Sequence, residues 1–563
     1  MSGEAGYTRL AEDVTLSVVV PVYNLAGSIV QNVTVIRDRV AVGVDGAIEV
    51  IVVSDGSVDR TDEALLEGRL DRVRLLHYDR NLGKGYAVKV GALEAKGRWV
   101  AYCDADLDLD PGLLPGYVAE AERDGLDFAI GSKRHPRSQV RYPRSRRVSS
   151  WLFQQVVRLL FRLQVKDTQT GLKVFRREIA EQVVPLLLVK RYAFDIELLA
   201  VARAFGFARL REMPVKLDYR FTGSGVRSRA VLAALVDTAA IFYRLRVLKT
   251  YQRKRALFGA FGWTRPGGYA PLVTVVAREP DALRRLDTAG LRVELARTAE
   301  DRRRVASEST SELLVFVEDG GVVSANFLTA TVPFFARGEV AAVVVSKVAP
   351  TSGTARERAA AAIRESRFGG GSQYYRFMPG NIRYVRDFRS ATYIVRREAY
   401  LRLPDDVSAE DVPEAIDLAG ERVVYTPEAF VVASAAPLFL PHLRNAVAYG
   451  RARAAMMVRR GPAAVRRSTA AAVAVAGLVA LGWLLVFAGR GWLAIWAAVV
   501  ALYLALVLVQ AALAGIQHGS AAIGGLVAVG LVLTHAAYLG GLVTGLVSGR
   551  RLAGIREPRD RRG

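Results

Sequence analysis

The feature that most constrains this chain is a long stretch near its C-terminal end that is almost free of charge. Residues 468–549 contain one ionised side chain, Arg490. Because roughly 20 consecutive apolar residues cross a bilayer, the stretch has room for about three crossings, at 468–489, 491–514 and 521–548. A buried hairpin of a soluble core is the less favoured alternative, since such cores seldom contain uncharged runs of this length. We therefore expect α-helical transmembrane segments over residues 468–549.

The chain as a whole is both basic and apolar. Its 78 Lys and Arg outnumber 55 Asp and Glu, and 51% of its residues are hydrophobic. Acid-free basic clusters at 133–147, 244–255 and 444–467 adjoin apolar segments. This pairing predicts contact with an anionic membrane surface, and a solvated charged face is the alternative. The basic clusters do not belong to a recognisable nucleic-acid-binding fold, so we expect no nucleic-acid partner.

Charge also predicts the orientation of the chain in the membrane. Positive residues favour the cytoplasmic side, which places residues 1–467 there in a multi-pass protein of the cell membrane. Three crossings would put the basic tail at 550–563 on the far side, so either one apolar run is re-entrant or the rule is broken. The opening residues contain no apolar signal region, and the single cysteine, Cys103, fits a reducing compartment.

The N-terminal part alternates strands with helices. TLSVVVPVYN at 15–24, IEVIVVSDGSVDRT at 48–61 and GRWVAYCDADLDLDP at 97–111 are β-rich runs that end in polar residues, and helical stretches lie between them. This alternation predicts an α/β fold with a parallel sheet, whose ligands bind at the carboxyl ends of the strands. The polar residues that end the strands should therefore meet in one cleft.

Three aspartates follow the third run, at positions 104, 106 and 108. Their carboxylates repel one another unless a cation lies among them, and a hard divalent ion takes oxygen ligands that it shares with substrate phosphates. A solvated acidic turn is the alternative. The loop RNLGKG at 80–85 is suited to a diphosphate, although it is not a Walker A motif. We interpret Cys103 as a small buried strand residue, because the neighbouring acids raise the pKa of its thiol.

The order PVYN, SDGS, RNLGKG and DAD resembles glycosyltransferase family 2, whose fold is the Rossmann-like GT-A fold. DTQTGLKVFRRE at 167–178 and FDIEL at 194–198 are similar to the polyprenyl-phosphate glycosyltransferases, especially those that form dolichyl-phosphate β-glucose. The resemblance covers about residues 14–225, and Thr170-Gly171-Leu172-Lys173 favours glucose over mannose. Leu25 and Ser54 depart from the family pattern, which has acids at both positions.

The resemblance implies an inverting, metal-dependent transfer of a hexose, with glucose from UDP-glucose expected, to a polyprenyl phosphate, with Mg²⁺ or Mn²⁺ as cofactor. It implies catalytic roles for Asp104, Asp106 and Asp195, and metal ligation by Asp104, Asp106 and Asp108. The residues implied in nucleotide-sugar binding are Pro21, Tyr23, Asp55, Ser57, Arg80, Gly83, Lys84 and Asp104. The acceptor phosphate is expected to bind Ser132, Lys133, Arg134, Arg144, Arg147 and Lys173.

The acceptor also bears on the need for a base. A phosphate is already ionised near neutral pH, so a general base is not strictly required. Asp195 and Glu197 are then expected to hold sugar hydroxyls or to steer basic residues, with a base role less favoured.

A second, incomplete copy of the motifs follows the first. Residues 313–328 parallel the segment around Asp104, and TYIVRREAY at 392–400 parallels LKVFRREIA at 172–180. The second copy has no counterpart of SDGS or RNLGKG, about one strand-helix unit is missing, and its acids are reduced to Glu318-Asp319-Gly320. We interpret 270–436 as a noncatalytic GT-A-like domain, with an active second transferase as the alternative.

The expected organisation has six parts. They are a GT-A domain at 1–225, a basic amphipathic linker helix at 226–269, the incomplete domain at 270–436, a basic interfacial helix at 437–467, the transmembrane segments at 468–549 and the tail at 550–563. Glycine spacing at 541, 545 and 549 permits helix pairing within the chain or in a homo-oligomer.

Three alternative functions stay open. One is a polysaccharide or glycolipid glycosyltransferase with a sugar acceptor, although the QxxRW motif of processive synthases is absent. The others are a bifunctional tandem transferase and a noncatalytic membrane scaffold.

Overall fold

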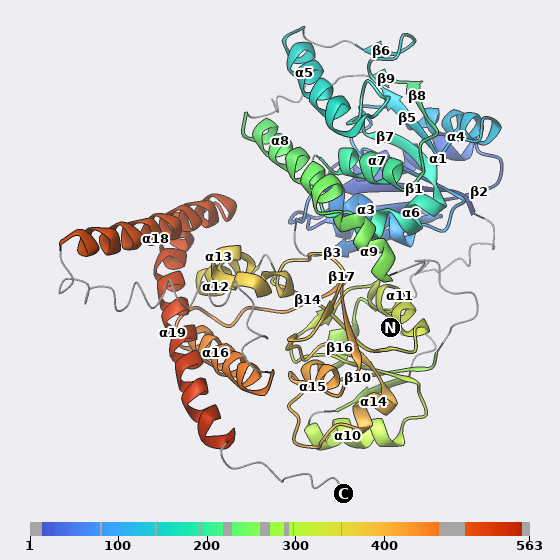
Figure 1. The fold of residues 1–563 in the computed structure, drawn as a ribbon. Coiled ribbons are helices and arrows are strands. Elements are labelled where there is room, and N and C mark those ends of the chain that lie inside the picture. Colours follow the sequence, from blue (N-terminus) through green and yellow to red (C-terminus); the bar gives the residue numbers. More distant parts are fainter. Residues whose placement is uncertain are drawn as a thin grey trace, which may run out of the picture. The chain divides into compact units, whose positions relative to one another are not determined.

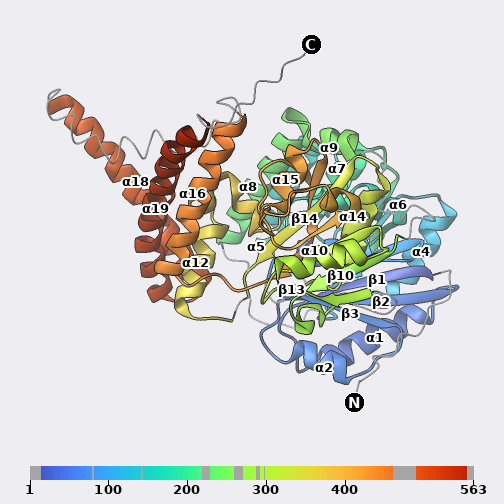
Figure 2. The ribbon, with the colours of Figure 1, turned by 90° about the horizontal axis from the view of Figure 1, so that it is seen from below.

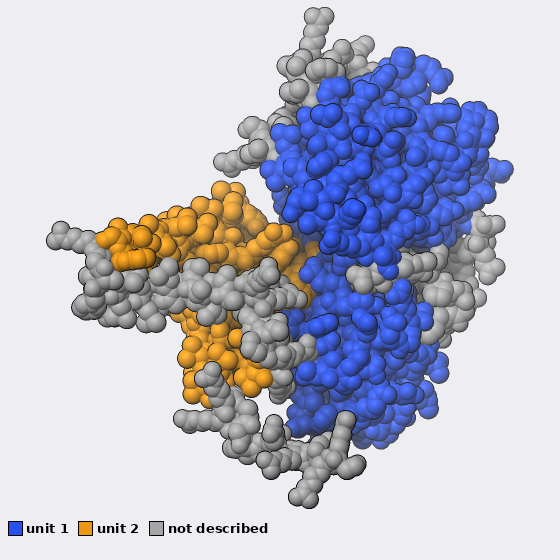
Figure 3. All heavy atoms as spheres, viewed as in Figure 1, with its two compact units in different colours: residues 1–345, 381–430 blue, residues 346–380, 431–563 orange. Residues whose placement is uncertain are grey.

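A computed structural model describes residues 14–78, 81–140, 144–191, 193–217, 228–258, 271–286, 292–296, 298–350, 352–460 and 490–553. The chain divides into two compact units, coloured separately in Figure 3. Unit 1 holds residues 1–345 and 381–430, and unit 2 holds residues 346–380 and 431–563. Residues 346–380, which the sequence placed in the domain at 270–436, therefore belong to unit 2.

Unit 1 contains a seven-stranded sheet in what we call the first lobe, residues 14–217 (Figure 1). The strand order is β3-β2-β1-β4-β7-β5-β8. Strands β3, β2, β1 and β4 are parallel, and β7 runs antiparallel between β4 and β5. The bounds are β1 Val14–Val22, β2 Ala47–Asp55, β3 Val73–Tyr78, β4 Trp99–Cys103, β5 Phe128–Ser132, β7 Leu172–Arg176 and β8 Leu210–Pro214, and a separate pair is formed by β6 Gln139–Val140 and β9 Lys216–Leu217.

Helices cover both faces of this sheet. Alternate strand residues, such as Leu16 and Val18 of β1, pack with α1, α2 and α4, while Val19 on the opposite face lies against Gly91 of α3. The period of two along each strand thus gives two apolar faces, as a buried parallel sheet requires. The helices are α1 Ile29–Ala41, α2 Thr61–Glu67, α3 Lys84–Glu94, α4 Leu114–Arg123, α5 Arg144–Phe161, α6 Arg177–Gln182 and α7 Phe194–Ala204. The predicted α/β fold of this part is confirmed.

The second lobe of unit 1, residues 271–345 and 381–430, is built on another sheet. Its order is β11-β10-β12-β16-β14-β17-β13, with β15 paired to β17. The antiparallel β16 lies between β12 and β14, as β7 lies between β4 and β5 in the first lobe. Three parallel strands, β11, β10 and β12, stand where the first lobe has four, which agrees with a repeat shortened by about one strand-helix unit.

The strands of the second lobe are β10 Val273–Ala277, β11 Arg292–Leu295, β12 Leu313–Phe316, β13 Val322–Val323, β14 Val340–Val348, β15 Arg383–Val385, β16 Tyr393–Arg396 and β17 Arg422–Val432. Its helices are α10 Ala299–Glu308, α11 Phe327–Thr331, α14 Arg397–Leu401 and α15 Val412–Leu418.

The linker at 226–269 is more broken and more buried than a free interfacial helix. It contains α8 Ser228–Phe242, a π-helical turn at Tyr243–Val247 and α9 Thr250–Phe258. Tyr251 of α9 is buried, and its hydroxyl donates to Glu197 of α7. Part of the apolar face of the linker is therefore covered by the first lobe.

Unit 2 is helical in its described part. Its helices are α12 Ala355–Glu365, α13 Arg367–Gly370, α16 Leu440–Arg460, α18 Arg490–Gln517 and α19 Ala521–Ala553. Among the described residues, two helices are long and apolar enough to cross a membrane, at Gly491–Gln517 and Ala521–Val547. The expected first crossing at 468–489 lies outside the described residues.

The interfacial location expected for the helix at 437–467 stays a prediction. Helix α16 lies along α19 in both Figure 1 and Figure 2. Gly541 and Gly545 of α19 face Val447 and Ala454 of α16 so closely that an added Cβ would collide. Small residues allow this close approach of two helices. The predicted glycine face is thus used within the chain.

Candidate active site

The loops after β1 and β2 are tied together, as expected for neighbouring parallel strands. The backbone N–H of Asn24 donates to Ser57 Oγ at 3.1 Å, and Asn24 Oδ1 accepts from the N–H of Val58 at 2.9 Å. Leu25 donates its N–H to Thr61 Oγ1 at 2.8 Å, and Ser54 Oγ donates to Ser57 Oγ at 3.0 Å. Leu25 and Ser54, which depart from the family pattern, thus both form hydrogen bonds that stabilise these two loops.

Asp55 organises the next loop. Its buried carboxylate accepts from the hydroxyl of Tyr78 at 2.8 Å, from the N–H of Leu82 at 2.7 Å and from the N–H of Gly83 at 2.9 Å. Burial raises the pKa of Asp55 to about 6, against the effect of these donors. Asp55 therefore fixes the backbone of the loop that leads to Lys84.

Other predicted nucleotide-binding residues lie nearby. Pro21 is half-buried at the end of β1, and Tyr23 is exposed by 47%. Arg80 lies outside the described residues.

Gly83 and Lys84 form the start of α3. Gly83 has φ +107°, a value that L side chains rarely adopt, and α3 begins at Lys84. The ammonium of Lys84 pairs with Asp104. Burial opposes a charged amine here, but the charges of Asp104, Asp195 and Asp106 outweigh it and raise the pKa of Lys84. The charged form of Lys84 is therefore favoured by three acids from two other parts of the lobe.

Two of the aspartates after β4 interact electrostatically, because the charge of Asp104 acts on the carboxyl of Asp106. Asp106 is open to solvent, yet desolvation and the charge of Asp104 raise its pKa. Leu107 has φ +60°, and the N–H of Asp108 donates to Asp106 Oδ1 at 3.1 Å. Among the described residues, no three His, Cys, Asp or Glu side chains gather as a metal-binding group. Metal ligation by Asp104, Asp106 and Asp108 stays a prediction.

The pair still fits a magnesium-like ion. Such ions are usually held by one or two carboxylates together with substrate phosphates. Two acids at one strand end, one of which is raised in pKa by the other, are a suitable donor set.

Asp195, at the start of α7, is held by two residues of the sheet. It accepts from the hydroxyl of Tyr102 and from Lys173 Nζ at 2.8 Å, and Lys173 also donates to the carbonyl of Thr170 at 2.6 Å. Lys173 is fully buried. In this structure the ammonium of Lys173 positions Asp195, and its expected contact with the acceptor phosphate stays a prediction.

The motif TGLK also touches the aspartate pair. Leu172 is paired with Cys103 in the antiparallel register of β7 and β4, which brings Gly171 against the carboxylate of Asp104. A Cβ at position 171 would collide with that carboxylate. Cys103 itself is buried, and burial followed by the charge of Asp104 raises the pKa of its thiol, as predicted.

The predicted acceptor residues are only partly accessible. Ser132 is buried, whereas Lys133 and Arg134 are half-buried. Asp167 accepts from the N–H of Lys133 at 3.1 Å and from Thr170 Oγ1 at 2.6 Å. The side chains at 144 and 147 are not among those described. The basic segment is thus anchored next to the TGLK motif, and among its described cations Lys133 and Arg134 are half-buried and Arg137 is exposed.

The structure adds Arg191, which the sequence analysis missed. Glu197 is buried and accepts from the N–H groups of Leu188 and Val189 at 2.8 and 2.7 Å, so it fixes the loop that leads to Arg191. The side chain of Arg191 is exposed beside Gly83, and within the described part of the chain it makes no hydrogen bond or ion pair. The basic pair Lys190-Arg191, two residues before the FDIEL motif at 194–198, was the signal that could have identified it.

These features agree with comparisons with known proteins. The family model described as Glycosyl transferase family 2 matches residues 17–184. Glycosyltransferase AglD of Haloferax volcanii is 35% identical over 208 residues, which are 36% of this chain and 33% of that protein. Dolichyl-phosphate beta-glucosyltransferase of Drosophila melanogaster is 35% identical over 33% of this chain and 62% of its own length. Dolichyl-phosphate beta-glucosyltransferase ALG5C of Trichomonas vaginalis is 30% identical over 41% of this chain and 72% of its own length.

The chain belongs to glycosyltransferase family 2. Within that family it groups with the polyprenyl-phosphate glycosyltransferases, since dolichyl-phosphate glucosyltransferases are among its relatives at 30 to 35% identity. The match spans only 33% of AglD and 62% of the Drosophila enzyme. The family model ends at residue 184, before the second lobe and unit 2.

Proposed function

We propose that the chain transfers glucose from UDP-glucose to a polyprenyl phosphate at a membrane. The observation that carries this proposal is the ion pair between Lys84, from the loop at 80–85, and Asp104, with the charges of Asp195 and Asp106 acting on the same ammonium. It joins a cation suited to a diphosphate with acids suited to a metal and to sugar hydroxyls. The names of the curated relatives support glucose and a lipid phosphate as substrates.

Mg²⁺ or Mn²⁺ is the proposed cofactor, with Asp104 and Asp106 as its protein ligands. When bound, such an ion neutralises charge that develops on the departing diphosphate.

The residues of the chain then supply binding and orientation. The N–H groups at the start of α3 and the ammonium of Lys84 bind the diphosphate. Asp195, fixed by Tyr102 and Lys173, is placed to accept hydrogen bonds from sugar hydroxyls. Lys133 and Arg134 attract the acceptor phosphate, which needs no base because it is already ionised.

The second lobe is proposed to be noncatalytic, because it has no counterpart of SDGS or RNLGKG and its acids lie beside arginines. Asp319 pairs with Arg278 at 2.5 Å, and Asp411 pairs with Arg389 at 2.6 Å. Glu410 lies 3.5 Å from the same Arg389.

Membrane attachment is proposed through α18 and α19, with the first lobe on the cytoplasmic side. The length and apolar composition of these two helices support it.

The proposal is tested by Asp106→Asn in the full chain. This change removes one carboxylate of the pair and keeps its size, so we expect transfer of labelled glucose to extractable lipid to fall at least 100-fold, about 2.7 kcal/mol. The assay contains UDP-glucose, polyprenyl phosphate and Mg²⁺ or Mn²⁺, and the product is read by mass.

The matched control is Asp38→Asn, an exposed acid of α1 that pairs with its neighbour Arg37. It should transfer glucose at the parent rate. Undiminished transfer by the Asp106→Asn variant would show that the chemistry lies elsewhere.

A further inference from the structure

A buried ion pair links the two lobes of unit 1. Lys89 of α3 lies 2.8 Å from Glu428 of β17, and the side chains are exposed by only 6% and 2%. Lys89 also donates to the carbonyls of Pro185 and Leu187 at 3.0 and 3.1 Å. The ammonium thus donates hydrogen bonds to two carbonyls of the first lobe, and its contact with the carboxylate of Glu428 from the second lobe is an ion pair.

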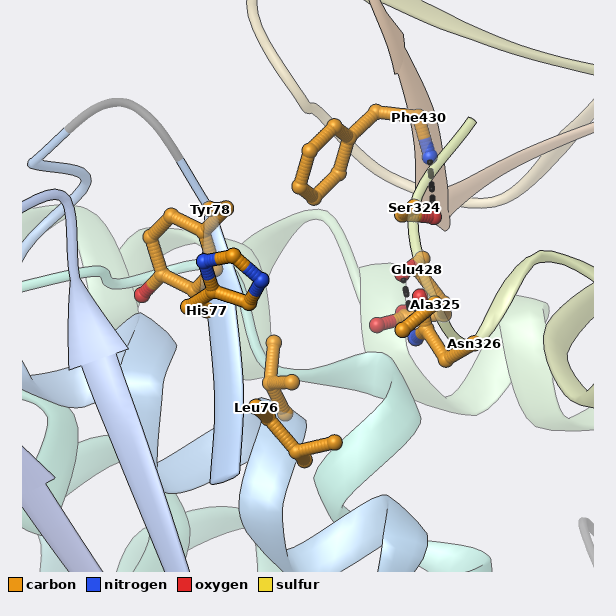
Figure 4. A pocket seen from close by; sticks show the side chains of 9 residues that line it. Leu76, His77, Tyr78, Ser324, Ala325, Asn326, Glu428 and Phe430 are labelled. Atoms are coloured by element: carbon orange, nitrogen blue, oxygen red, sulfur yellow. Dashed lines mark hydrogen bonds between the residues drawn. The ribbon is translucent and has the colours of Figure 1, made fainter. Parts of the chain in front are cut away.

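Aromatic and backbone contacts surround this pair. Tyr86 of α3 donates its hydroxyl to the carbonyl of Pro427 at 3.1 Å. Tyr78 of β3 meets Phe430 of β17 edge to face, with ring centroids 5.9 Å apart, and Figure 4 shows the two rings beside the small pocket that Glu428 also lines. Because water is largely excluded here, an unpaired charge at either position would be costly.

Tyr78 and Tyr86 also contact the residues that hold the loop at 80–85, or that loop itself. Tyr78 donates to Asp55, which holds the N–H groups of Leu82 and Gly83. The N–H of Tyr86 donates to the carbonyl of Gly83 at 2.8 Å. Helix α3, which β17 contacts through Tyr86 and Lys89, begins at Lys84. The second lobe therefore contacts the helix and the strand that together fix the glycine loop.

We propose that Glu428 is a positioning residue for the nucleoside diphosphate of the donor. Three residues of the second lobe, which we call the brace, then hold α3 so that Lys84 lies beside Asp104. The brace consists of Pro427, Glu428 and Phe430. The inference rests on the proposed function only in taking a nucleoside diphosphate as the ligand of that loop. It assigns to the noncatalytic lobe a role in donor binding, carried out on the same polypeptide.

The test compares the full-length parent with Glu428→Gln. This substitution keeps the size of the side chain and removes the charge that balances Lys89. We expect the dissociation constant of UDP, measured by calorimetry with Mg²⁺, and the KM for UDP-glucose to rise at least tenfold. The KM for the lipid phosphate should stay unchanged, because Lys133 and Arg134 do not depend on α3.

Thr329→Val is the matched control. Thr329 Oγ1 lies 2.9 Å from Glu94 Oε1, a contact between the same two lobes at the C-terminal end of α3. This variant should bind UDP as the parent does. If Glu428→Gln fails to fold, Glu428→Asp replaces it, with a smaller rise expected. The double variant Lys89→Met, Glu428→Met removes both buried charges and should regain part of the lost affinity.

The outcomes separate the two proposals. A folded Glu428→Gln chain that binds UDP as tightly as the parent overturns the brace and leaves a purely structural ion pair. A parent that binds UDP but transfers no glucose to lipid phosphate overturns the proposed acceptor, while the binding comparison still tests Glu428. A parent that binds no UDP overturns both.

Discussion

At the scale of single residues, Asp55 has the most informative titration. Its pKa is raised to about 6 because it is buried, yet its ionised form holds the loop that carries Gly83 and Lys84. Protonation removes an acceptor from that loop. We therefore expect the KM for UDP-glucose to rise as the pH falls below about 6, whereas an Asp55→Asn variant should show a weaker dependence on pH. Initial rates between about pH 5 and 7.5 measure this.

The expected rise in KM at low pH cannot arise from unfolding of the chain caused by protonation of Asp55. The folded chain binds the Asp55 proton more tightly than the unfolded chain, whose pKa is near 3.8. Acidification from about pH 6 toward 4 thus favours the folded state as far as Asp55 is concerned. A thermal unfolding midpoint recorded at each pH is the control, and a KM that stays flat in the parent would contradict the prediction.

Residues at strand ends were predictable from sequence, whereas burial was not. The positions of Lys84, Asp104 and Asp106 follow from their places after strands, because the ends of parallel strands share one edge. Lys173 and Ser132 were expected to meet the acceptor phosphate, but both are buried. Their burial depends on β7 entering between β4 and β5, and nothing in the local sequence specifies that insertion.

At the scale of elements, β7 sets the position of the aspartate pair. Gly171 precedes β7 and leaves space for the carboxylate of Asp104. In Gly171→Ala the new methyl group should displace that carboxylate, so we expect kcat/KM to fall at least tenfold, about 1.4 kcal/mol, with little change in the unfolding midpoint. Initial rates over a range of Mn²⁺ concentrations would also show a higher metal requirement.

Gly116→Ala is the control for this change. Gly116 lies exposed in α4, and an added Cβ there meets no atom within 4 Å. Alanine also suits a helix better than glycine, so the variant should keep full activity and equal or higher stability. Equal activity of the Gly171→Ala and Gly116→Ala variants would refute the role given to β7.

Helix packing was harder to foresee than strand order. The basic composition of 437–467 favoured a helix on the membrane surface, and α16 lies along the glycine face of α19. His442 of α16 bonds to Thr534 of α19 at 2.9 Å. Composition reports the polarity of a helix, whereas the partner of that helix depends on matching small residues far away in the sequence.

At the scale of the whole molecule, the sheets of the two lobes resemble each other in strand order but differ in the residues at their strand ends. The first lobe keeps the glycine loop and acids that face Lys84, while arginines pair with the acids of the second lobe. The internal repeat was visible in the sequence because its strand-end motifs recur in order. The contact of Lys89 with Glu428 was not, since it joins positions that no local pattern connects.

The last prediction concerns the proposed membrane topology. It can be tested by cysteine labelling, because the chain contains a single cysteine. Cys103 is buried and its thiol pKa is raised, so it should react slowly with an impermeant maleimide. Helices α18 and α19 are joined by a turn at 518–520 and are each long enough to cross a bilayer. In sealed vesicles, Gly491→Cys and Ser520→Cys should therefore be labelled from opposite sides. The parent protein supplies the background, and labelling of both variants from one side would mean that α18 does not cross.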